Sequence, residues 1–176
     1  MKNSLILALG LFGVIAVLPQ NAMADCVLCA SAESGDRAAM KAIIDDCVAE
    51  IDQGNEPAVN VDGKDSSERT ALYLAAENNR KKIVRLLLKN DCANANPNVP
   101  GGVDEETPLI AAVRNKNAGI VTRLLKEDNI DLEAKQSDGK TALWFALNKK
   151  KPEIMRQLIG NGAKTSNLKN TPSAEV

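Results

Sequence analysis

Thr107-Pro108-Leu109-Ile110-Ala111-Ala112-Val113 is the stretch that decides the fold, because two other segments of the chain repeat its pattern. Residues 70–76 read Thr-Ala-Leu-Tyr-Leu-Ala-Ala, and residues 141–147 read Thr-Ala-Leu-Trp-Phe-Ala-Leu. The threonines that open these segments are 37 and 34 residues apart along the chain. A period in this range predicts a stack of similar helical units, each of which buries its apolar side against its neighbours.

A second apolar block follows each of these segments at the same offset, at residues 83–88, 120–125 and 154–159. Within each block the apolar residues recur at i, i+3 and i+4, which is the spacing of one helix face. Short polar stretches at residues 77–79, 114–116 and 148–150 separate the two blocks of each unit. Each unit is therefore predicted to be a helix, a tight turn, a second helix and a loop into the next unit.

The units resemble the ankyrin repeat. The family's Thr-Pro-Leu start is matched in full at residues 107–109, its Asp-Gly-x-Thr turn at 138–141, and its Gly-Ala ending at 162–163. The resemblance covers residues 30 to 165 and implies an all-α solenoid of about four helix-turn-helix units with β-hairpin-like loops. The glycine that the family places between its two helices is replaced by Asn79, Lys116 and Lys150. Of these residues only asparagine readily adopts left-handed geometry, so the two lysine turns are expected to be less ideal.

The resemblance also divides the chain into segments. Residues 25–61 are expected to form an N-terminal capping repeat, because a terminal unit has only one neighbour and is atypical. Its second helix is predicted to be long, with Ile43, Cys47 and Ile51 on one stripe and Gly54 at its end. Residues 62–165 are expected to hold three ankyrin repeats, at about 66–98, 103–135 and 137–165. Residues 166–176 are polar and without period, and we expect them to be disordered.

The first 24 residues are expected to be a secretory signal peptide rather than part of the fold. Lys2 precedes an apolar run over residues 5–18, and Ala22-Met23-Ala24 forms a small-x-small cleavage site. An uncleaved membrane anchor is the alternative, but the run has about 14 residues and a span needs about 20. A lipoprotein is disfavoured because Asp25 stands directly before Cys26, where a small residue belongs. The mature protein is therefore expected to be periplasmic, or alternatively secreted, with no membrane contact.

Four cysteines, Cys26, Cys29, Cys47 and Cys92, follow the expected cleavage site. An even number in an exported chain predicts disulfide bonds, and three pairings are possible. The antiparallel helices of the cap favour Cys26 with Cys47, which leaves Cys29 for Cys92. A Cys-x-x-Cys pair can also be a redox centre, but here no βαβ pattern surrounds Cys26 and Cys29.

The composition argues against catalysis. The chain has no histidine, which removes the commonest general base and the commonest metal ligand. Its 22 basic and 23 acidic residues are close to balance, so the overall charge does not predict a nucleic-acid-binding protein. The segment Pro100-Gly101-Gly102 lacks the lysine and the helix of a phosphate-binding loop. The basic run Lys149–Lys151 falls in a turn between helices and is interpreted as a solvated turn or as a contact for an acidic partner. We expect no enzyme, no metal and no cofactor, and a monomer.

The resemblance implies a partner-binding surface on the concave side of the stack, where the residues around each repeat's threonine and at the end of its first helix vary. Tyr73 and Trp144 stand where the family usually has histidine, and they are interpreted either as interface anchors or as packing residues. Val103 and Ser137 lie among the loop residues that would border this surface. The predicted partner-binding residues are Ser66, Ser67, Arg69, Tyr73, Glu77, Asn78, Asp104, Glu106, Arg114, Asn115, Asp138, Lys140, Trp144, Asn148 and Lys149.

The sequence therefore predicts a non-catalytic module that binds one protein partner in the periplasm. An inhibitor or immunity protein of an exported toxin or enzyme is the form that its small size and export favour, by analogy with the family. An accessory protein of a periplasmic stress-defence enzyme is one alternative. A thiol–disulfide active protein that uses Cys26 and Cys29 is another.

Overall fold

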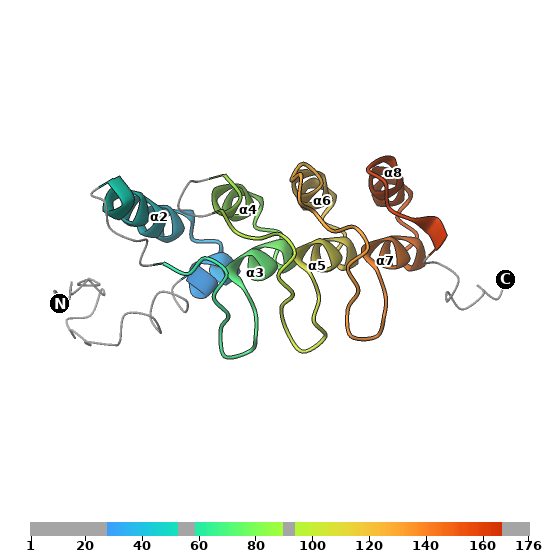
Figure 1. The fold of residues 1–176 in the computed structure, drawn as a ribbon, viewed down its shortest axis with the longest axis horizontal. Helices are drawn as coiled ribbons and strands as arrows, with labels where there is room; N and C mark the ends of the chain where they lie inside the picture. The colour runs from blue at the N-terminus through green and yellow to red at the C-terminus, as the bar shows by residue number, and fades with distance from the viewer. Residues whose placement is uncertain (1–27, 53–58, 90–93, 167–176) are drawn as a thin grey trace.

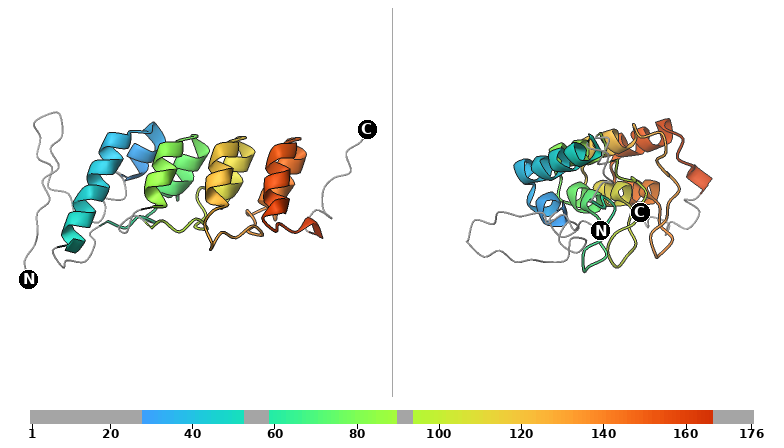
Figure 2. Two further views of the ribbon diagram at one scale, coloured as in Figure 1. Left: turned by 90° about the horizontal axis from the view of Figure 1, so that it is seen from above. Right: turned by 60° about the vertical axis from the view of Figure 1, so that its left-hand side comes forward.

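The computed structural model describes residues 28–52, 59–89 and 94–166. It is an all-α solenoid, as the sequence predicted, in which the helices form two layers (Figure 1). The first layer holds helical residues 28–34 and the helices α3 (Ala71–Glu77), α5 (Pro108–Arg114) and α7 (Ala142–Asn148). The second layer holds α2 (Arg37–Asp52), α4 (Lys81–Leu87), α6 (Ala118–Leu124) and α8 (Pro152–Gly160). Figure 2 shows the helix pairs standing in a row from the N-terminal to the C-terminal unit.

The repeated threonine starts each first-layer helix. The hydroxyl oxygens of Thr70, Thr107 and Thr141 accept hydrogen bonds from the backbone N–H three residues later, at 3.1, 3.3 and 3.4 Å. Such an N-cap satisfies one of the amide groups that an α-helix leaves without an internal partner. Pro108 stands at the first position of α5, where a missing N–H does no harm.

The turns between the two helices of each unit share one left-handed geometry. The φ angles are 57° at Asn79, 63° at Lys116 and 51° at Lys150, and Gly35 in the capping unit has a φ of 81°. In each turn the N–H of the residue that follows the left-handed one donates to a carbonyl of the preceding helix. The donors are Arg80, Asn117 and Lys151, at 2.8, 2.8 and 3.0 Å. Both lysine turns thus have the same left-handed φ and the same closing hydrogen bond as the asparagine turn, although the lysine Cβ makes this conformation unfavourable.

Loops that project from the helix layers join the repeats. Each loop is closed by one antiparallel bridge, between Lys64 and Thr70, Gly101 and Glu106, or Lys135 and Thr141. We call these loops the three fingers (residues 64–70, 101–106 and 135–141); they point to the same side of the molecule (Figure 1). The first two fingers have left-handed glutamates, at φ 58° and 53°, where the third has Gly139 at 81°. Backbone bonds join neighbouring fingers, because Gly102 N–H donates to the Glu68 carbonyl at 3.0 Å and Ser137 N–H donates to the Asp104 carbonyl at 2.9 Å.

The core lies between the two layers and continues through all the units. Small side chains line the first layer, where Ala75, Ala111 and Ala146 are fully buried and let the helices approach closely. Larger side chains from the second layer, such as Ile83 and Leu124, fill the space between the layers. None of the helices in the described ranges is long and apolar enough to span a lipid bilayer.

The capping unit has a longer second helix, of 16 residues, than the repeats that follow it. Met40, Ile44 and Cys47 are its buried stripe, and Ile43 packs against the core at its edge. The proposed signal peptide, Cys26, the side chain of Ile51, Gly54, Cys92 and the tail from residue 167 lie outside the part that the structure describes.

Candidate partner-binding face

The fingers and the first-layer helices together form one face of the molecule, which we call the hairpin face (Figure 1). Among the predicted partner-binding residues, some are exposed, some half-buried and some buried. Those that are exposed are Ser66, Ser67, Asn78, Asp104, Asn115, Asp138, Asn148 and Lys149. Those that are half-buried are Arg69, Glu77, Arg114 and Lys140, and those that are buried are Tyr73, Glu106 and Trp144.

The two aromatic residues of the predicted site lie beneath the surface. Tyr73 is 5% exposed and Trp144 is 9% exposed, and Ile110 fills the equivalent place in the repeat between them. The Tyr73 ring lies against Gly101, where an added Cβ would stand 2.7 Å from the ring's Cγ. Gly101 therefore makes room for an aromatic ring.

A charged cluster connects the first two full repeats below the fingers. Glu106 is buried, and its Oε1 lies 2.9 Å from Nη1 of Arg114, off the line of a hydrogen bond. The Tyr73 hydroxyl donates to Glu77 at 3.2 Å and lies 3.5 Å from Glu106. Arg114 Nη2 also lies 3.6 Å from Glu77 Oε1, so the Arg114 guanidinium forms ion pairs with carboxylates of two repeats.

The buried position of this cluster changes how its groups titrate. Burial raises the pKa of Glu106, and the opposing effect of Arg114 does not cancel the rise. Burial and the neighbouring carboxylates Glu77 and Glu106 also raise the pKa of the Tyr73 hydroxyl well above its usual range. The tyrosine therefore stays protonated at neutral pH and acts as a hydrogen-bond donor to the carboxylates.

Asp65 organises the first finger, although the sequence analysis did not single it out. Its carboxylate accepts hydrogen bonds from the backbone N–H groups of Ser67 and Arg69, both at 2.9 Å, and Arg69 Nη2 lies 2.9 Å away. Burial alone would raise the pKa of Asp65, but these bonds outweigh it and hold that pKa below its ordinary value. An aspartate that starts a turn and bonds the backbone two residues later is a recognisable sequence signal.

In the third finger Lys140 stands directly before the threonine, at the place that Arg69 has in the first finger. Lys140 Nζ lies 2.7 Å from a carboxylate oxygen of Asp138 and 4.4 Å from the centre of the Trp144 ring. The Trp144 ring meets Phe145 edge-to-face at 5.0 Å between ring centres. The tryptophan therefore holds a cation in place at the surface.

Val103 stands out on the middle finger. It is 93% exposed, and in the described residues the other large apolar side chain with high exposure is Ile159, at 46%, in α8. Asp104 and Glu105 follow Val103 and are also exposed. The middle finger thus presents an apolar side chain next to two acidic ones.

Side-chain hydrogen bonds between units fix the first layer against the turns. The Asn117 amide donates to the Ala76 carbonyl at 2.9 Å in a buried contact, and Asn115 donates to the Glu77 carbonyl at 3.3 Å. Arg80 Nε donates to the Glu33 carbonyl at 3.1 Å, which ties the first full repeat to the capping unit. These bonds join each first-layer helix of the face to the neighbouring unit.

The described residues contain no group of three or more acidic, histidine or cysteine side chains placed to hold a metal ion. Cys29 is 4% exposed, and its Sγ lies 3.4 Å from the Arg69 carbonyl oxygen. Cys47 is 2% exposed. Because Cys26 and Cys92 lie outside the described residues, the disulfide pairing stays a prediction.

Paired helices, left-handed turns and projecting fingers that recur in register define a repeat protein whose successive units share one core. A family model for ankyrin repeats (3 copies) matches residues 8–100 and, in a second match, residues 92–170. The chain belongs to the ankyrin-repeat family, as the repeated threonine segments indicated. Ankyrin repeats are modules for protein–protein interaction and are generally non-catalytic.

Proposed function

We propose that this protein binds one protein partner through the hairpin face. The observation that carries the proposal is the row of fingers, which are bonded to one another through the backbone and end in exposed side chains. Because the face is already ordered, binding requires little further loss of conformational entropy. The exposed serine, asparagine and charged side chains would form the polar part of the interface.

Val103 is the residue at which we place the centre of the contact. A large apolar side chain that is 93% exposed gains more from burial at an interface than any polar neighbour. Asp104 and Glu105 beside it favour a partner surface that combines an apolar pocket with a basic rim.

Export to the periplasm belongs to the same proposal. It is supported by the leader pattern of residues 1–24 and by the cysteines that follow it. Within this setting we propose that the protein inhibits or neutralises an exported enzyme or toxin. The burial of Cys29 favours binding over thiol exchange, because a substrate disulfide could not reach that sulfur without unfolding of the cap.

The test uses two variants that each remove one exposed apolar side chain. A partner recovered by affinity capture from the periplasm is titrated against the wild type, Val103→Ser and Ile159→Ser. We expect Val103→Ser to weaken the affinity by about tenfold or more, as loss of a central apolar contact does. Ile159→Ser should leave the affinity unchanged, since α8 ends the second layer. Equal effects of the two substitutions, or no effect of Val103→Ser, would contradict binding at the middle finger.

The proposal that this protein is an inhibitor is tested by the activity of its partner. Once the partner is purified, its activity is measured with and without a stoichiometric amount of this protein. Loss of activity supports an inhibitor, and unchanged or increased activity favours an accessory role. Neither result alters the assignment of the hairpin face.

A further inference from the structure

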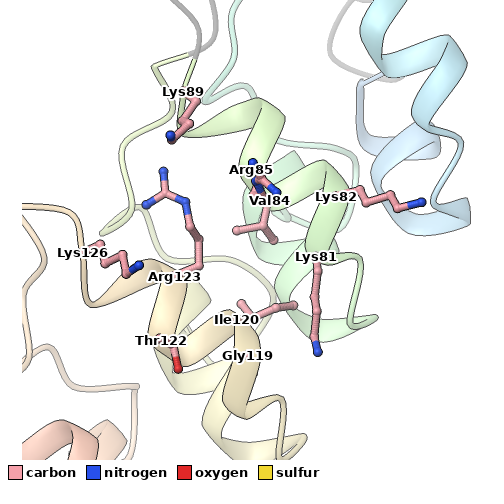
Figure 3. A pocket seen from close by; sticks show the side chains of 10 residues that line it. All are labelled: Lys81, Lys82, Val84, Arg85, Lys89, Gly119, Ile120, Thr122, Arg123 and Lys126. Carbon is pink, nitrogen blue, oxygen red and sulfur yellow. The ribbon is translucent and has the colours of Figure 1, made fainter.

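A basic cleft lies on the second-helix layer, away from the fingers (Figure 3). Its volume is about 470 Å³, and it runs between α4 and α6. Val84, Gly119, Ile120 and Thr122 contribute uncharged lining. The remaining lining residues are all cations: Lys81, Lys82, Arg85, Lys89, Arg123 and Lys126.

Cations line one side of α4 and the turn that follows it. Lys81 and Arg85 are four residues apart in α4, so they lie on the same side of the helix and repel one another, and Lys89 stands in the turn after the helix ends. Among the described residues, no ion pair involves Lys81, Arg85 or Lys89. The same holds for Lys82 and Lys126. Arg123 is the exception, because it pairs with Glu127. In the view of Figure 3 the ends of Lys89 and Arg123 point toward one another.

A second cleft, of about 400 Å³, lies on the other side of α4. Arg37, Lys82, Arg85 and Lys89 line it, together with Leu86. Figure 3 shows Lys82 directed toward this side, where the capping unit stands. The basic residues of α4 and the turn after it therefore border two neighbouring clefts. The whole chain has a net charge of −1, so this surface is a local separation of charge rather than a consequence of composition.

We propose that the cleft between α4 and α6 binds an acidic segment of a partner polypeptide in an extended conformation. Residues four apart on a helix are about 6 Å apart along its axis. Alternate side chains of an extended chain are about 6.6 Å apart, so carboxylates at every second position match the spacing of Lys81 and Arg85 in α4, and Lys89 extends the basic lining beyond the helix. The second wall, with Arg123 and Lys126, would contact the opposite side of the same segment.

Two other anionic partners fit this cleft less well. Base stacking needs exposed aromatic rings, and within the described ranges the aromatic residues, Tyr73, Trp144 and Phe145, are buried in the core. A membrane surface is flat and would reach only the rim of a cleft, and among the residues that the structure describes no exposed large apolar side chain lines the cleft to enter a bilayer. An extended polypeptide with carboxylates at alternate positions matches the spacing of the α4 cations Lys81 and Arg85. The proposal is independent of the hairpin face, which lies on the first-layer side.

The test titrates the full mature chain against a fluorescein-labelled peptide that alternates glutamate and serine. Binding is followed by fluorescence anisotropy. The variant Arg85→Gln/Lys89→Gln removes two charges from the cleft, and Lys81→Gln/Lys126→Gln changes both of its walls. The matched control, Arg156→Gln/Lys164→Gln, removes two exposed charges from α8 and the segment after it, outside both the cleft and the hairpin face. Thermal unfolding verifies that each variant is folded, as expected for exposed side chains.

We expect each cleft variant to bind the peptide about tenfold or more weakly and the control to bind within about twofold of the wild type. Binding should weaken as salt is raised, and a glutamine–serine peptide should not bind. Equal losses for the cleft variants and the control would overturn the proposal. Stronger binding to phosphatidylglycerol vesicles or to a single-stranded oligonucleotide than to the peptide, lost in the cleft variants, would also overturn it and assign the cleft to that class of partner.

Discussion

At the scale of single residues, the turns between helices show how this chain departs from the ideal repeat. Lys116 and Lys150 adopt the left-handed conformation at φ 63° and 51°, which glycine adopts without strain. The backbone at these two inter-helix turns is therefore in an unfavourable conformation, as it is at the left-handed glutamates of the first two fingers. Packing on both sides of each turn provides the compensating stability.

Replacing Lys116 with glycine should raise the free energy of unfolding by about 0.5–1 kcal/mol, because relief of the left-handed strain exceeds the added freedom of the unfolded chain. Urea denaturation at neutral pH measures the change. Arg156→Gly, at an exposed position in the middle of α8, should instead lower the free energy of unfolding by about 1 kcal/mol. If Lys116→Gly destabilises the protein as much as this control, the strain is absent.

Asp65 gives a prediction that depends on pH. Asp65→Asn should lower the free energy of unfolding at pH 7 by about 1–2 kcal/mol, because the ionised carboxylate accepts bonds from Arg69 and Ser67. The folded pKa lies below the ordinary value of 3.8, so the contribution is complete above that value and is lost as the pH falls through the folded pKa. The difference between wild type and variant should therefore shrink when denaturation is repeated near pH 3. A difference that is equal at both pH values would show that the charge of Asp65 is not involved.

At the scale of elements, contacts between units rather than helix propensity hold the fold together. The first-layer helices α3, α5 and α7 have only seven residues each, which is too short to be stable alone in water. Their buried alanines and leucines provide stability only when the neighbouring units are in place. Polar contacts that bridge two units should therefore matter more than equivalent contacts on the surface.

Asn117 is the clearest case of such a bridge. Asn117→Ala removes a buried hydrogen bond to the last turn of α3 and should cost about 1–2 kcal/mol in the free energy of unfolding. Asn115→Ala removes an exposed bond of the same kind and should cost less than about 0.5 kcal/mol. Chemical denaturation of both variants measures the two values. Equal costs would mean that burial does not strengthen this contact.

The sequence predicted the helices and their connections, because the threonine caps and the apolar spacing act over a few residues. It did not decide whether Tyr73 and Trp144 are exposed, since that depends on which neighbouring repeat covers them. Glu106 was predicted to contact a partner, yet its carboxylate lies under the fingers beside Arg114. The basic cleft was not predicted either, because its two walls are contributed by different repeats and their cations meet only after the repeats stack.

At the scale of the whole molecule, the capping unit has one neighbouring repeat, as the last repeat has at the other end of the described stack, so end units open more readily than inner ones. If the predicted bonds Cys26–Cys47 and Cys29–Cys92 form, reduction should speed amide hydrogen exchange in residues 28–52 and leave α7 and α8 unchanged. Reduction of a disulfide typically lowers the free energy of unfolding by about 2–4 kcal/mol. Hydrogen exchange with mass spectrometry, combined with peptide mapping of the oxidised protein, tests both the pairing and its effect. Four free thiols in protein purified from the periplasm would contradict the prediction.

The whole molecule offers two separate surfaces, the hairpin face and the basic cleft, on opposite layers. A rigid solenoid can hold both in a fixed relation, because each unit contacts only its neighbours and the contacts repeat along the stack. A partner with an acidic extension could therefore be bound by the hairpin face and the cleft together. In that case, combining Val103→Ser with the cleft substitutions would weaken the affinity more than either change alone.

Site-specific photo-crosslinking in cells tests the central claim most directly. A photoreactive amino acid is placed singly at Ser66, Val103 and Asn148 on the hairpin face, and at Asp128 and Glu153 as exposed control positions. The account predicts one discrete crosslinked species of the same mass increment from the hairpin-face positions and none from the controls. Crosslinks to a protein from the control positions alone, with none from the fingers, would contradict it.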